Sequence, residues 1–308
     1  MLMKKMIFYL AAAHVVIILI ILSFSGCKDE KKEKDAFSVA FLTDIHLQLE
    51  DDAVKGFTQA LDTVNALNPD FIITGGDLIM DALEQSHGRA DSLYNLYMEV
   101  VKKSKSPVYN TMGNHEIYGI YNKSGADIAN PEYGEKMFEK RLGKSYYSFE
   151  HKGWKFMIIN SIEDTKKGGY IGQVDTAQIS WIKSELKKTD RTTPLVLSTH
   201  IPFITASTQK YDGSTLPNDS SLVVFNSKEV ISLFTGYNLK LVLQGHLHTV
   251  EDIYIDGIHF ITGGAVSGGW WRGPNRGFEE GFVYITFGND AFRWRYVDYG
   301  WQTNNPGN

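Results

Sequence analysis

The sequence predicts one α/β domain over residues 37–300, and two observations support this class. In the first third of the chain, short apolar segments of β-prone residues alternate with segments whose apolar residues recur at helical spacing. The last part, residues 250–300, is rich in β-prone residues instead. A chain of 308 residues with 43% apolar and 22% charged residues is also long and apolar enough for a large core.

The first third is expected to run strand, helix, strand, helix, strand. Its β-prone runs are short, whereas the segments between them place apolar residues along one helical face. Parallel neighbouring strands joined by right-handed crossovers follow from this order. The strands are expected at residues 37–42, 71–74 and 108–111, and the helices at residues 52–67 and 89–103.

The rest of the chain predicts two β-hairpins and several further strands. Lys152-Gly153 and Asp256-Gly257 are turn dipeptides between β-prone segments, and Asp175 is a suitable N-cap for a helix that follows it. The remaining elements are that helix at residues 176–188, a short helix at 227–234, and strands at 146–151, 154–160, 195–198, 239–243, 253–255, 258–261, 281–287 and 292–297.

Residues 1–26 predict a secretory signal peptide. Two lysines precede an apolar run at residues 6–23, and small residues then lead to Cys27. This layout resembles a bacterial lipoprotein signal, in which the cysteine is lipidated, and residues 27–36 form a charged tether. We therefore expect a lipid-anchored protein of the cell envelope, at the periplasmic or surface side of the outer membrane. A signal-anchor helix with an incidental cysteine is the alternative, because about 20 apolar residues span a bilayer.

The charge pattern argues against a surface for duplex nucleic acid. The formal net charge is −5, and no stripe of clustered Lys and Arg stands out. No segment indicates an obligate protein partner. Two loops, residues 118–132 and 203–218, are long enough to be functional lids.

Five short motifs, each placed just after a predicted strand, carry most of the chemistry. Ligands of α/β sheets collect beyond the carboxyl ends of the strands, so the motifs are expected to meet. Their oxygen and nitrogen donors suit divalent cations, and two such cations would clamp a phosphate ester and activate a water. The motifs are Asp44-Ile45-His46, Gly75-Gly76-Asp77, Gly113-Asn114-His115-Glu116, His200 and Gly245-His246-Leu247-His248.

The spacing within the motifs also favours a shared site. Asp44 and His46 lie two residues apart, so both side chains would point to the same side of an extended segment, and His246 and His248 repeat this spacing. Asp77 follows two glycines, which allow a sharp turn and a close approach, and its two oxygens are able to bridge two metals.

Taken together over residues 37–264, the five motifs resemble the calcineurin-like metallophosphoesterase superfamily. The resemblance implies a four-layer α/β/β/α sandwich of two mixed β-sheets flanked by helices. It also implies that His115 binds no metal and acts on the leaving group, while Glu116 orients His115 or has a plain structural role. The implied ligands are Asp44, His46 and His248 for one metal, Asn114, His200 and His246 for the second, and Asp77 for both.

The same resemblance implies a mechanism and limits the metals. A hydroxide that bridges the two metals would attack phosphorus, and protonated His115 would donate to the leaving alcohol. Purple acid phosphatases carry a tyrosine iron ligand three residues after the bridging aspartate, where this chain has Met80, so a ferric-tyrosinate site is not expected. We expect manganese, with iron, zinc and cobalt left open.

The segment that follows the last motif suggests a substrate. Residues 263–273 are rich in glycine and resemble a tail found in some bacterial calcineurin-like phosphoesterases. Trp270 or Trp271 is expected to stack on a nucleobase, and Arg272 or Arg276 to bind a phosphate. The alternative is that the tryptophans pack on the core or its rim.

A nucleotide-type phosphodiester or pyrophosphate, met outside the cytoplasm, is therefore the leading substrate. Ile117-Tyr118 is similar to the corresponding residues of the branch that hydrolyses ADP-ribose and related nucleotides. Alternatives are a phosphomonoesterase, a phosphoprotein phosphatase or a phospholipid hydrolase. An alternative of another class is a non-catalytic surface lipoprotein that uses the fold as a binding module.

Overall fold

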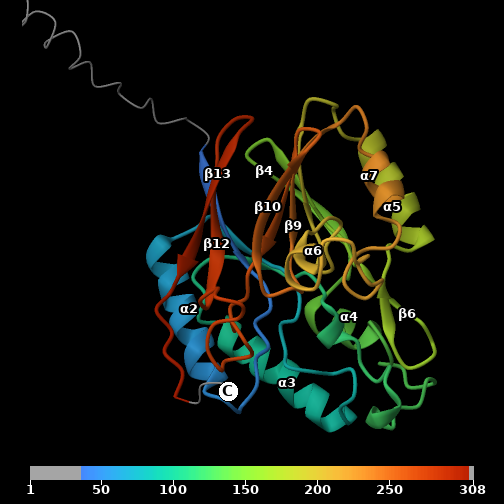
Figure 1. Cartoon of the computed structure of the whole chain (residues 1–308), viewed down its shortest axis with the longest axis vertical. Coiled ribbons are helices and arrows are strands. Elements are labelled where there is room, and N and C mark those ends of the chain that lie inside the picture. The colour runs from blue at the N-terminus through green and yellow to red at the C-terminus, as the bar shows by residue number, and fades with distance from the viewer. Residues whose placement is uncertain (1–35, 305–308) are drawn as a thin grey trace, which may run out of the picture. The chain divides into compact units, whose positions relative to one another are not determined.

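Two β-sheets packed face to face form the centre of the structure, a computed structural model that describes residues 36–304 (Figure 1). Helices cover the outer faces of the sheets, which gives the four-layer α/β/β/α arrangement and confirms the predicted fold class (Figure 1). The predicted signal peptide, Cys27 and all of the predicted tether except Ala36 lie outside the described residues. Within residues 36–304, no helix combines the length and the apolar character needed to cross a bilayer.

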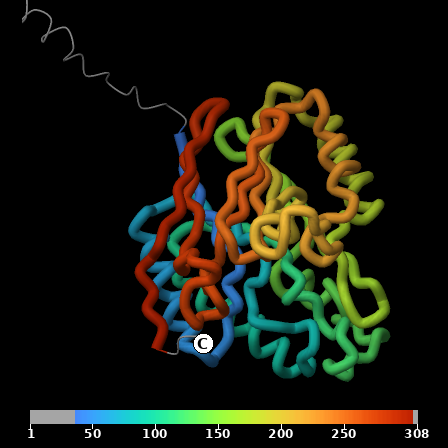
Figure 2. Tube along the Cα trace, viewed as in Figure 1, coloured from blue at the N-terminus to red at the C-terminus, as the bar shows by residue number. Residues whose placement is uncertain are grey.

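The first sheet contains the predicted β-α-β-α-β unit. In spatial order its strands are β13 (Phe292–Asp298), β12 (Gly281–Phe287), β1 (Phe37–Leu42), β2 (Phe71–Thr74) and β3 (Val108–Tyr109). β1, β2 and β3 are parallel, and the helices α2 (Ala53–Leu67) and α3 (His87–Val101) connect them. The antiparallel pair β12–β13 lies beside β1, so the two ends of the described chain share one sheet (Figure 2).

The second sheet contains both predicted hairpins. In spatial order its strands are β10 (Val250–Ile255), β11 (Ile258–Gly263), β9 (Asn238–Gln244), β8 (Pro194–Ser198), β5 (Trp154–Ile158) and β4 (Tyr147–His151). The four central strands are parallel, and β4 and β10 are antiparallel edges. The turn residues Lys152, Gly153, Asp256 and Gly257 all have positive φ, as tight two-residue hairpins require.

The core divides into two parts because successive residues of a strand face opposite sides. In β1, Val39 and Phe41 point toward the second sheet, whereas Ala40 and Leu42 pack with the outer helices. On the second sheet, the helices α5 (Thr176–Lys187) and α7 (Ser227–Ser232) supply part of the outer layer. Asp175 caps α5 as predicted, since its carboxylate accepts a hydrogen bond from the Gln178 amide at 2.8 Å.

Several short elements were not predicted. They are α4 (Lys136–Leu142), α6 (Ser207–Tyr211), and the strands β6 (Ile162–Asp164) and β7 (Tyr170–Gly172), which pair as a separate hairpin. Segments of three to seven residues are too short to show a period. Part of each long loop is ordered by such an element, because α6 lies within residues 203–218 and a 3-10 turn, Asn122–Ser124, within residues 118–132.

Glu132, at the end of the first long loop, is expected to contribute stability that depends on pH. Its carboxylate accepts from Lys140 and from Arg141 at 2.8 Å, and it contacts His87. The hydrogen bond from Lys140, together with those from Arg141 and His87, outweighs the opposing effect of burial and lowers the pKa of Glu132 to about 2. Because the folded-state pKa is depressed, the stabilisation is complete above the unfolded pKa of about 4.5 and is lost as the pH falls toward 2.

Urea unfolding at several pH values checks this prediction. Glu132→Gln should lower the free energy of unfolding by roughly 1–3 kcal/mol at pH 7, and the difference from the wild type should shrink steadily below pH 4.5. Glu99→Gln, on the exposed side of α3, is the matched control and should have little effect. A Glu132→Gln deficit that stayed constant from pH 7 to pH 3 would rule out the charge as its cause.

Candidate metal centre

The carboxyl ends of five strands bring all seven predicted metal ligands together. The segments that follow β1, β2, β3, β8 and β9 supply, in turn, Asp44 and His46, Asp77, Asn114, His200, and His246 and His248. Two of the compact groups, each with ligand atoms within 4.8 Å of one another, are Asp44 with His46 and His248, and Asp77 with His200 and His246. The Asn114 Oδ1 atom lies 3.1 Å from His200 Nε2 and extends the second group. These two groups correspond to the two sets of metal ligands that the family resemblance implies.

Five of these residues have a left-handed backbone, so the prediction that the ligands lie on extended segments is wrong. Asp44, His46 and Asp77 have φ values of 55°, 45° and 51°, and His246 and His248 have values of 73° and 52°. The residues therefore do not lie on extended segments whose side chains alternate. This conformation costs on the order of 1 kcal/mol or more for each non-glycine residue and is found mainly where function requires it.

Contacts between the loops hold the left-handed residues in place. The Asp44 amide donates to the Gly76 carbonyl at 3.0 Å, and the His46 amide donates to the Asp77 carbonyl at 2.9 Å. A Cβ atom at Gly76 would lie 2.6 Å from the His200 ring, and Gly76 has a φ of 91°. The close approach predicted from the two glycines is therefore present in the structure.

Asp77 lies at the centre of the group. Its Oδ2 atom is 3.2 Å from His200 Nε2 and 3.7 Å from His46 Nε2, and its Oδ1 atom accepts from the His115 amide at 2.9 Å. Burial alone would raise the pKa of Asp77, but the neighbouring His200 and His115 outweigh it and hold the pKa well below its ordinary value. The carboxylate is thus an anion in contact with both halves of the site.

The histidines are oriented with one nitrogen inward. His200 Nδ1 and His248 Nδ1 bond to the carbonyls of Gly75 at 2.8 Å and Gly268 at 2.6 Å, which turns each Nε2 toward the centre. There, His248 Nε2 lies 3.0 Å from His46 Nε2. Two inward nitrogens at this distance can share at most one proton between them. Backbone bonds that fix the outer nitrogen of a histidine are typical of metal ligands.

The protonation of the site also fits a bound cation. Burial, followed by the neighbouring His200, lowers the pKa of His246 to about 4, so its ring is neutral at pH 7, as a metal ligand must be. Burial lowers the pKa of His200 too, but the Asp77 carboxylate outweighs it and raises the value to about 9. A cation between Asp77 and His200 would take the place of that proton. The residues present therefore fit two divalent metal ions.

His115 stands beside the ligands. Its Nδ1 atom bonds to the Met80 carbonyl and so carries a proton, while Nε2 lies 3.8 Å from Asp77 Oδ2. Its ring meets the His46 ring edge-on at 4.6 Å, and 23% of its side chain is exposed. His46, Asp77 and His115 also form a third compact group of donors. The exposed edge of His115 gives it access to a ligand at the centre.

Glu116 has a structural role, which settles one of the two interpretations of this residue. Its side chain is fully buried and accepts four backbone amides, from Gly113, Asp77, Leu78 and Ile79, at 2.7 to 3.2 Å. Burial, followed by the Asp77 carboxylate, raises the pKa of Glu116, whereas the amides act in the opposite direction. The residue ties the loops after β2 and β3 together.

The residues predicted to contact the substrate lie in different environments. Trp270 is 44% exposed, and its ring lies 4.8 Å from the His248 ring and 6.1 Å from the His46 ring. Trp271 is fully buried and donates to the His46 carbonyl at 3.1 Å, so its expected contact with substrate is wrong. Arg272 is exposed, with its guanidinium 3.4 Å from Asp51. Arg276 stacks on Tyr211 at 4.2 Å.

Sequence reasoning missed Tyr170, on the hairpin β6–β7. Its ring meets the His246 ring edge-on with a centroid distance of 6.3 Å. Burial, followed by the Asp77 carboxylate, raises the pKa of the Tyr170 phenol above its ordinary value. The turn glycines Gly168 and Gly169 directly before Tyr170 were the available signal for this hairpin.

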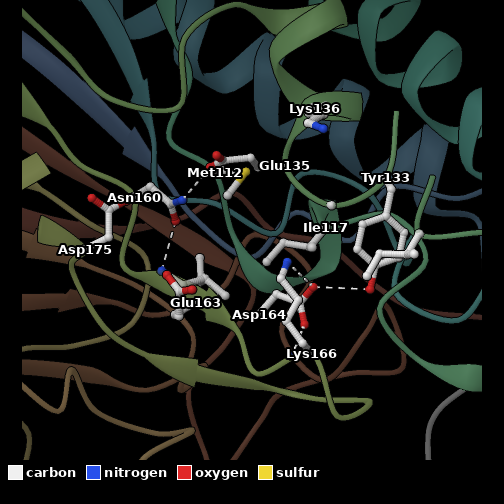
Figure 3. A pocket seen from close by; sticks show the side chains of 13 residues that line it. Met112, Ile117, Tyr133, Glu135, Lys136, Asn160, Glu163, Asp164, Lys166 and Asp175 are labelled. Atoms are coloured by element: carbon white, nitrogen blue, oxygen red, sulfur yellow. Dashed lines mark hydrogen bonds and ion pairs between the residues drawn. The ribbon is translucent and has the colours of Figure 1, made fainter. Parts of the chain in front are cut away.

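A cavity of about 280 Å³ is lined in part by the residues of β6, and none of the seven predicted ligands lines it (Figure 3). Four carboxylates, Glu135, Glu163, Asp164 and Asp175, take part in its wall. The Tyr133 hydroxyl donates to Asp164 across the cavity at 3.2 Å, as Figure 3 shows. The cavity is therefore a neighbour of the metal centre and separate from it.

Comparisons with known proteins agree on one family. A family model described as calcineurin-like phosphoesterase matches residues 37–250. The chain is similar to a probable cyclic nucleotide phosphodiesterase of Fibrobacter succinogenes, with 24% identity over 87% of the chain and 91% of that protein. It is also similar to the 3′,5′-cyclic adenosine monophosphate phosphodiesterase CpdA of Haemophilus influenzae, with 24% identity over 70% of the chain and 71% of that protein.

Solved structures agree on the fold. A dimetal phosphatase from Danio rerio aligns with a TM-score of 0.60 and 14% identity over 86% of the chain and 96% of that structure. GAP50, described as the anchor in the inner membrane complex of Plasmodium, aligns with a TM-score of 0.55 and 16% identity over 86% of the chain and 85% of that structure. At these identities the likeness concerns the fold alone.

Proposed function

The chain belongs to the calcineurin-like phosphoesterase family and is a hydrolase of phosphoesters, and from this premise we propose that it hydrolyses a nucleotide-type phosphodiester. Cleavage takes place at the candidate metal centre, with two divalent ions bound. The substrate is met outside the cytoplasm. A pyrophosphate bond between two nucleotide-type groups is the chemically related alternative.

One observation carries the proposal, namely the convergence of seven metal-ligand side chains from five strand ends. All seven positions hold side chains that are able to bind a metal, and five of these residues have an energetically costly left-handed backbone. A fold retained only as a binding module would have no use for that strain. The convergence therefore favours catalysis over the non-catalytic alternative.

The proposed mechanism assigns the metals to the two ligand groups. When bound, the metals polarise the phosphoryl oxygens and lower the pKa of an attacking water. Asp77 serves both positions because its carboxylate is close to His46 on one side and to His200 on the other. The other ligands are Asp44 and His248 for the first metal, and Asn114 and His246 for the second.

His115 is the proposed proton donor. Its Nδ1 atom is held by the Met80 carbonyl, so the partly exposed Nε2 atom is the one that is free to exchange a proton with a bound ester. Protonated His115 gives the proton from Nε2 to the oxygen of the departing alcohol. The backbone amide of His115 donates to Asp77 Oδ1, which couples the position of the acid to that of the carboxylate that both ligand groups would share.

Two observations support a nucleotide as the alcohol part of the diester. The relatives named above are a cyclic adenosine monophosphate phosphodiesterase and a probable cyclic nucleotide phosphodiesterase. In addition, Trp270 presents an exposed indole ring beside His46 and His248. An aromatic face at this position offers a base a stacking surface worth roughly 1–3 kcal/mol.

A substrate panel with metal-loaded protein tests this function. Chelation should abolish hydrolysis of bis-(p-nitrophenyl) phosphate, and re-addition of Mn²⁺ should restore it, with iron, zinc and cobalt compared in parallel. We expect 3′,5′- and 2′,3′-cyclic nucleotides to be cleaved at least about tenfold faster than a phosphomonoester or a phosphopeptide. The reverse preference would favour a phosphomonoesterase or phosphoprotein phosphatase, and no turnover with any metal would favour the binding module.

The proposed location depends on Cys27. We propose that lipidation of this cysteine anchors the domain in the cell envelope, through residues 27–36 as a tether. Metabolic labelling with a radioactive fatty acid should mark the wild type, and Cys27→Ala should lose both the label and the membrane fraction. Unchanged fractionation of Cys27→Ala would contradict the anchor.

A further inference from the structure

The hairpin β6–β7 is held firmly beside the metal centre. The Gly172 amide donates to the Ser220 carbonyl at 2.7 Å, and the Gly172 carbonyl accepts from the Phe225 amide at 2.6 Å. A Cβ atom at Gly172 would lie 2.4 Å from the Val223 carbonyl oxygen, so only glycine allows this approach. On the other strand, Tyr133 donates to Asp164. The hairpin is thus fixed on both sides, and a side chain that it carries is well positioned.

Tyr170 is the residue that this hairpin places at the centre. It pairs with Asp164 across the hairpin, and its ring packs edge-on against His246. The Tyr170 ring is half-buried, with its centroid 6.3 Å from that of His246. Tyr170 therefore borders the His200–His246 half of the site, whereas Trp270 borders the His46–His248 half.

The hydroxyl of Tyr170 has no hydrogen-bond partner within residues 36–304. By contrast, two fully buried tyrosines on α3 are bonded, since Tyr94 donates to the Glu116 carbonyl at 2.7 Å and Tyr97 donates to Asn110 at 2.6 Å. A free O–H donor that is held rigidly next to a centre for anionic esters has an evident acceptor, which is an oxygen of the bound phosphoryl group.

We propose that Tyr170 is a substrate-positioning residue, whose hydroxyl donates a hydrogen bond to a non-bridging oxygen of the phosphoryl group bound at the metal centre. The inference rests on the proposed phosphoester hydrolysis at that centre. A neutral hydrogen-bond donor at this position strengthens phosphoryl binding beyond what the metals provide. It does not compete with the histidines for coordination of those metals. It also fixes the rotation of the ester, so that one alcohol points toward His115 and the other group toward Trp270.

Tyr170→Phe tests the hydroxyl alone, because the ring that packs on His246 remains. Titration calorimetry of inorganic phosphate into Mn²⁺-loaded protein should give a dissociation constant about tenfold higher than that of the wild type. Against bis-(p-nitrophenyl) phosphate, kcat/KM should fall about tenfold, mainly through kcat if the bond strengthens in the transition state. Tyr254→Phe is the matched control, since it removes an exposed tyrosine hydroxyl on β10, outside both the hairpin and the site, and should change both values less than twofold.

The outcomes separate this inference from the proposed function. Phosphate affinity and kcat/KM equal to wild type in Tyr170→Phe would reduce Tyr170 to a packing role and overturn the proposal. A loss of bound manganese in Tyr170→Phe would also overturn it, because the hydroxyl would then act on the metal centre. If the wild-type protein cleaves no diester, the proposed function fails, while the phosphate titration still tests Tyr170.

Discussion

Asp77→Asn is expected to reduce the rate of phosphodiester hydrolysis at least about 10³-fold. The carboxylate lies within 3.2 to 3.8 Å of three histidine nitrogens and is the side chain that both ligand groups share. An amide in its place keeps the shape, removes the negative charge and turns one acceptor into a donor. Loss of a metal that supplies several kcal/mol of transition-state stabilisation corresponds to three or more powers of ten in rate.

Metal content gives this prediction a second measurement. Elemental analysis should find about two metal ions for each wild-type chain and fewer in Asp77→Asn, while the far-ultraviolet circular dichroism spectrum stays the same. Asp62→Asn, on the exposed face of α2, is the matched control and should retain both metal and activity. Full activity in Asp77→Asn would show that the assignment of this carboxylate as the shared ligand is wrong.

The identities of the candidate ligands were predictable from sequence because they sit in local patterns. Each motif directly follows a short β-prone run, three of them in the first sheet and two in the second, and within each sheet the parallel strands end at the same edge. The conformation of those motifs was not predictable in the same way. Asp44 and His246 adopt a left-handed backbone only because of contacts with loops far away in the sequence, such as the bond from the Asp44 amide to Gly76.

The two adjacent tryptophans show why substrate contacts were harder to predict. Trp270 and Trp271 both have positive φ and lie in an irregular loop, so neither helical nor strand periodicity distinguishes their environments. What separates them is the space beside α2. A Cβ atom at Gly56 would lie 2.2 Å from the Trp271 ring, so this helical glycine makes room for one indole and leaves the other exposed. Only the folded packing reveals that relation.

The hairpin β6–β7 was not predicted for a similar reason. Its strands, β6 and β7, contain three residues each, which is too few for an alternation of apolar and polar residues to be recognised. It is stabilised by backbone bonds to residues 220 and 225, about 50 positions later in the sequence. Tyr170 thus enters the site through tertiary structure, whereas the metal ligands enter it through motifs.

His115→Asn is expected to slow the hydrolysis of nucleotide diesters about 10²–10³-fold while both metals remain bound. Proton donation by a positioned side chain contributes about 10²–10⁴-fold to a rate, and the benefit is largest when the leaving alcohol is a poor leaving group. A ribose oxygen needs that proton, whereas p-nitrophenolate leaves readily without it. The rate at which the same variant hydrolyses bis-(p-nitrophenyl) phosphate should therefore fall by less than about tenfold.

The ratio of the two losses distinguishes an acid from a metal ligand. A ligand variant would lose both activities together with its metal, whereas a variant of the acid loses mainly the activity toward the poor leaving group. His259→Asn, on β11 and partly exposed, is the matched control and should change neither activity. Equal losses on both substrates, with less metal bound, would place His115 among the ligands, a position that its compact grouping with His46 and Asp77 also allows.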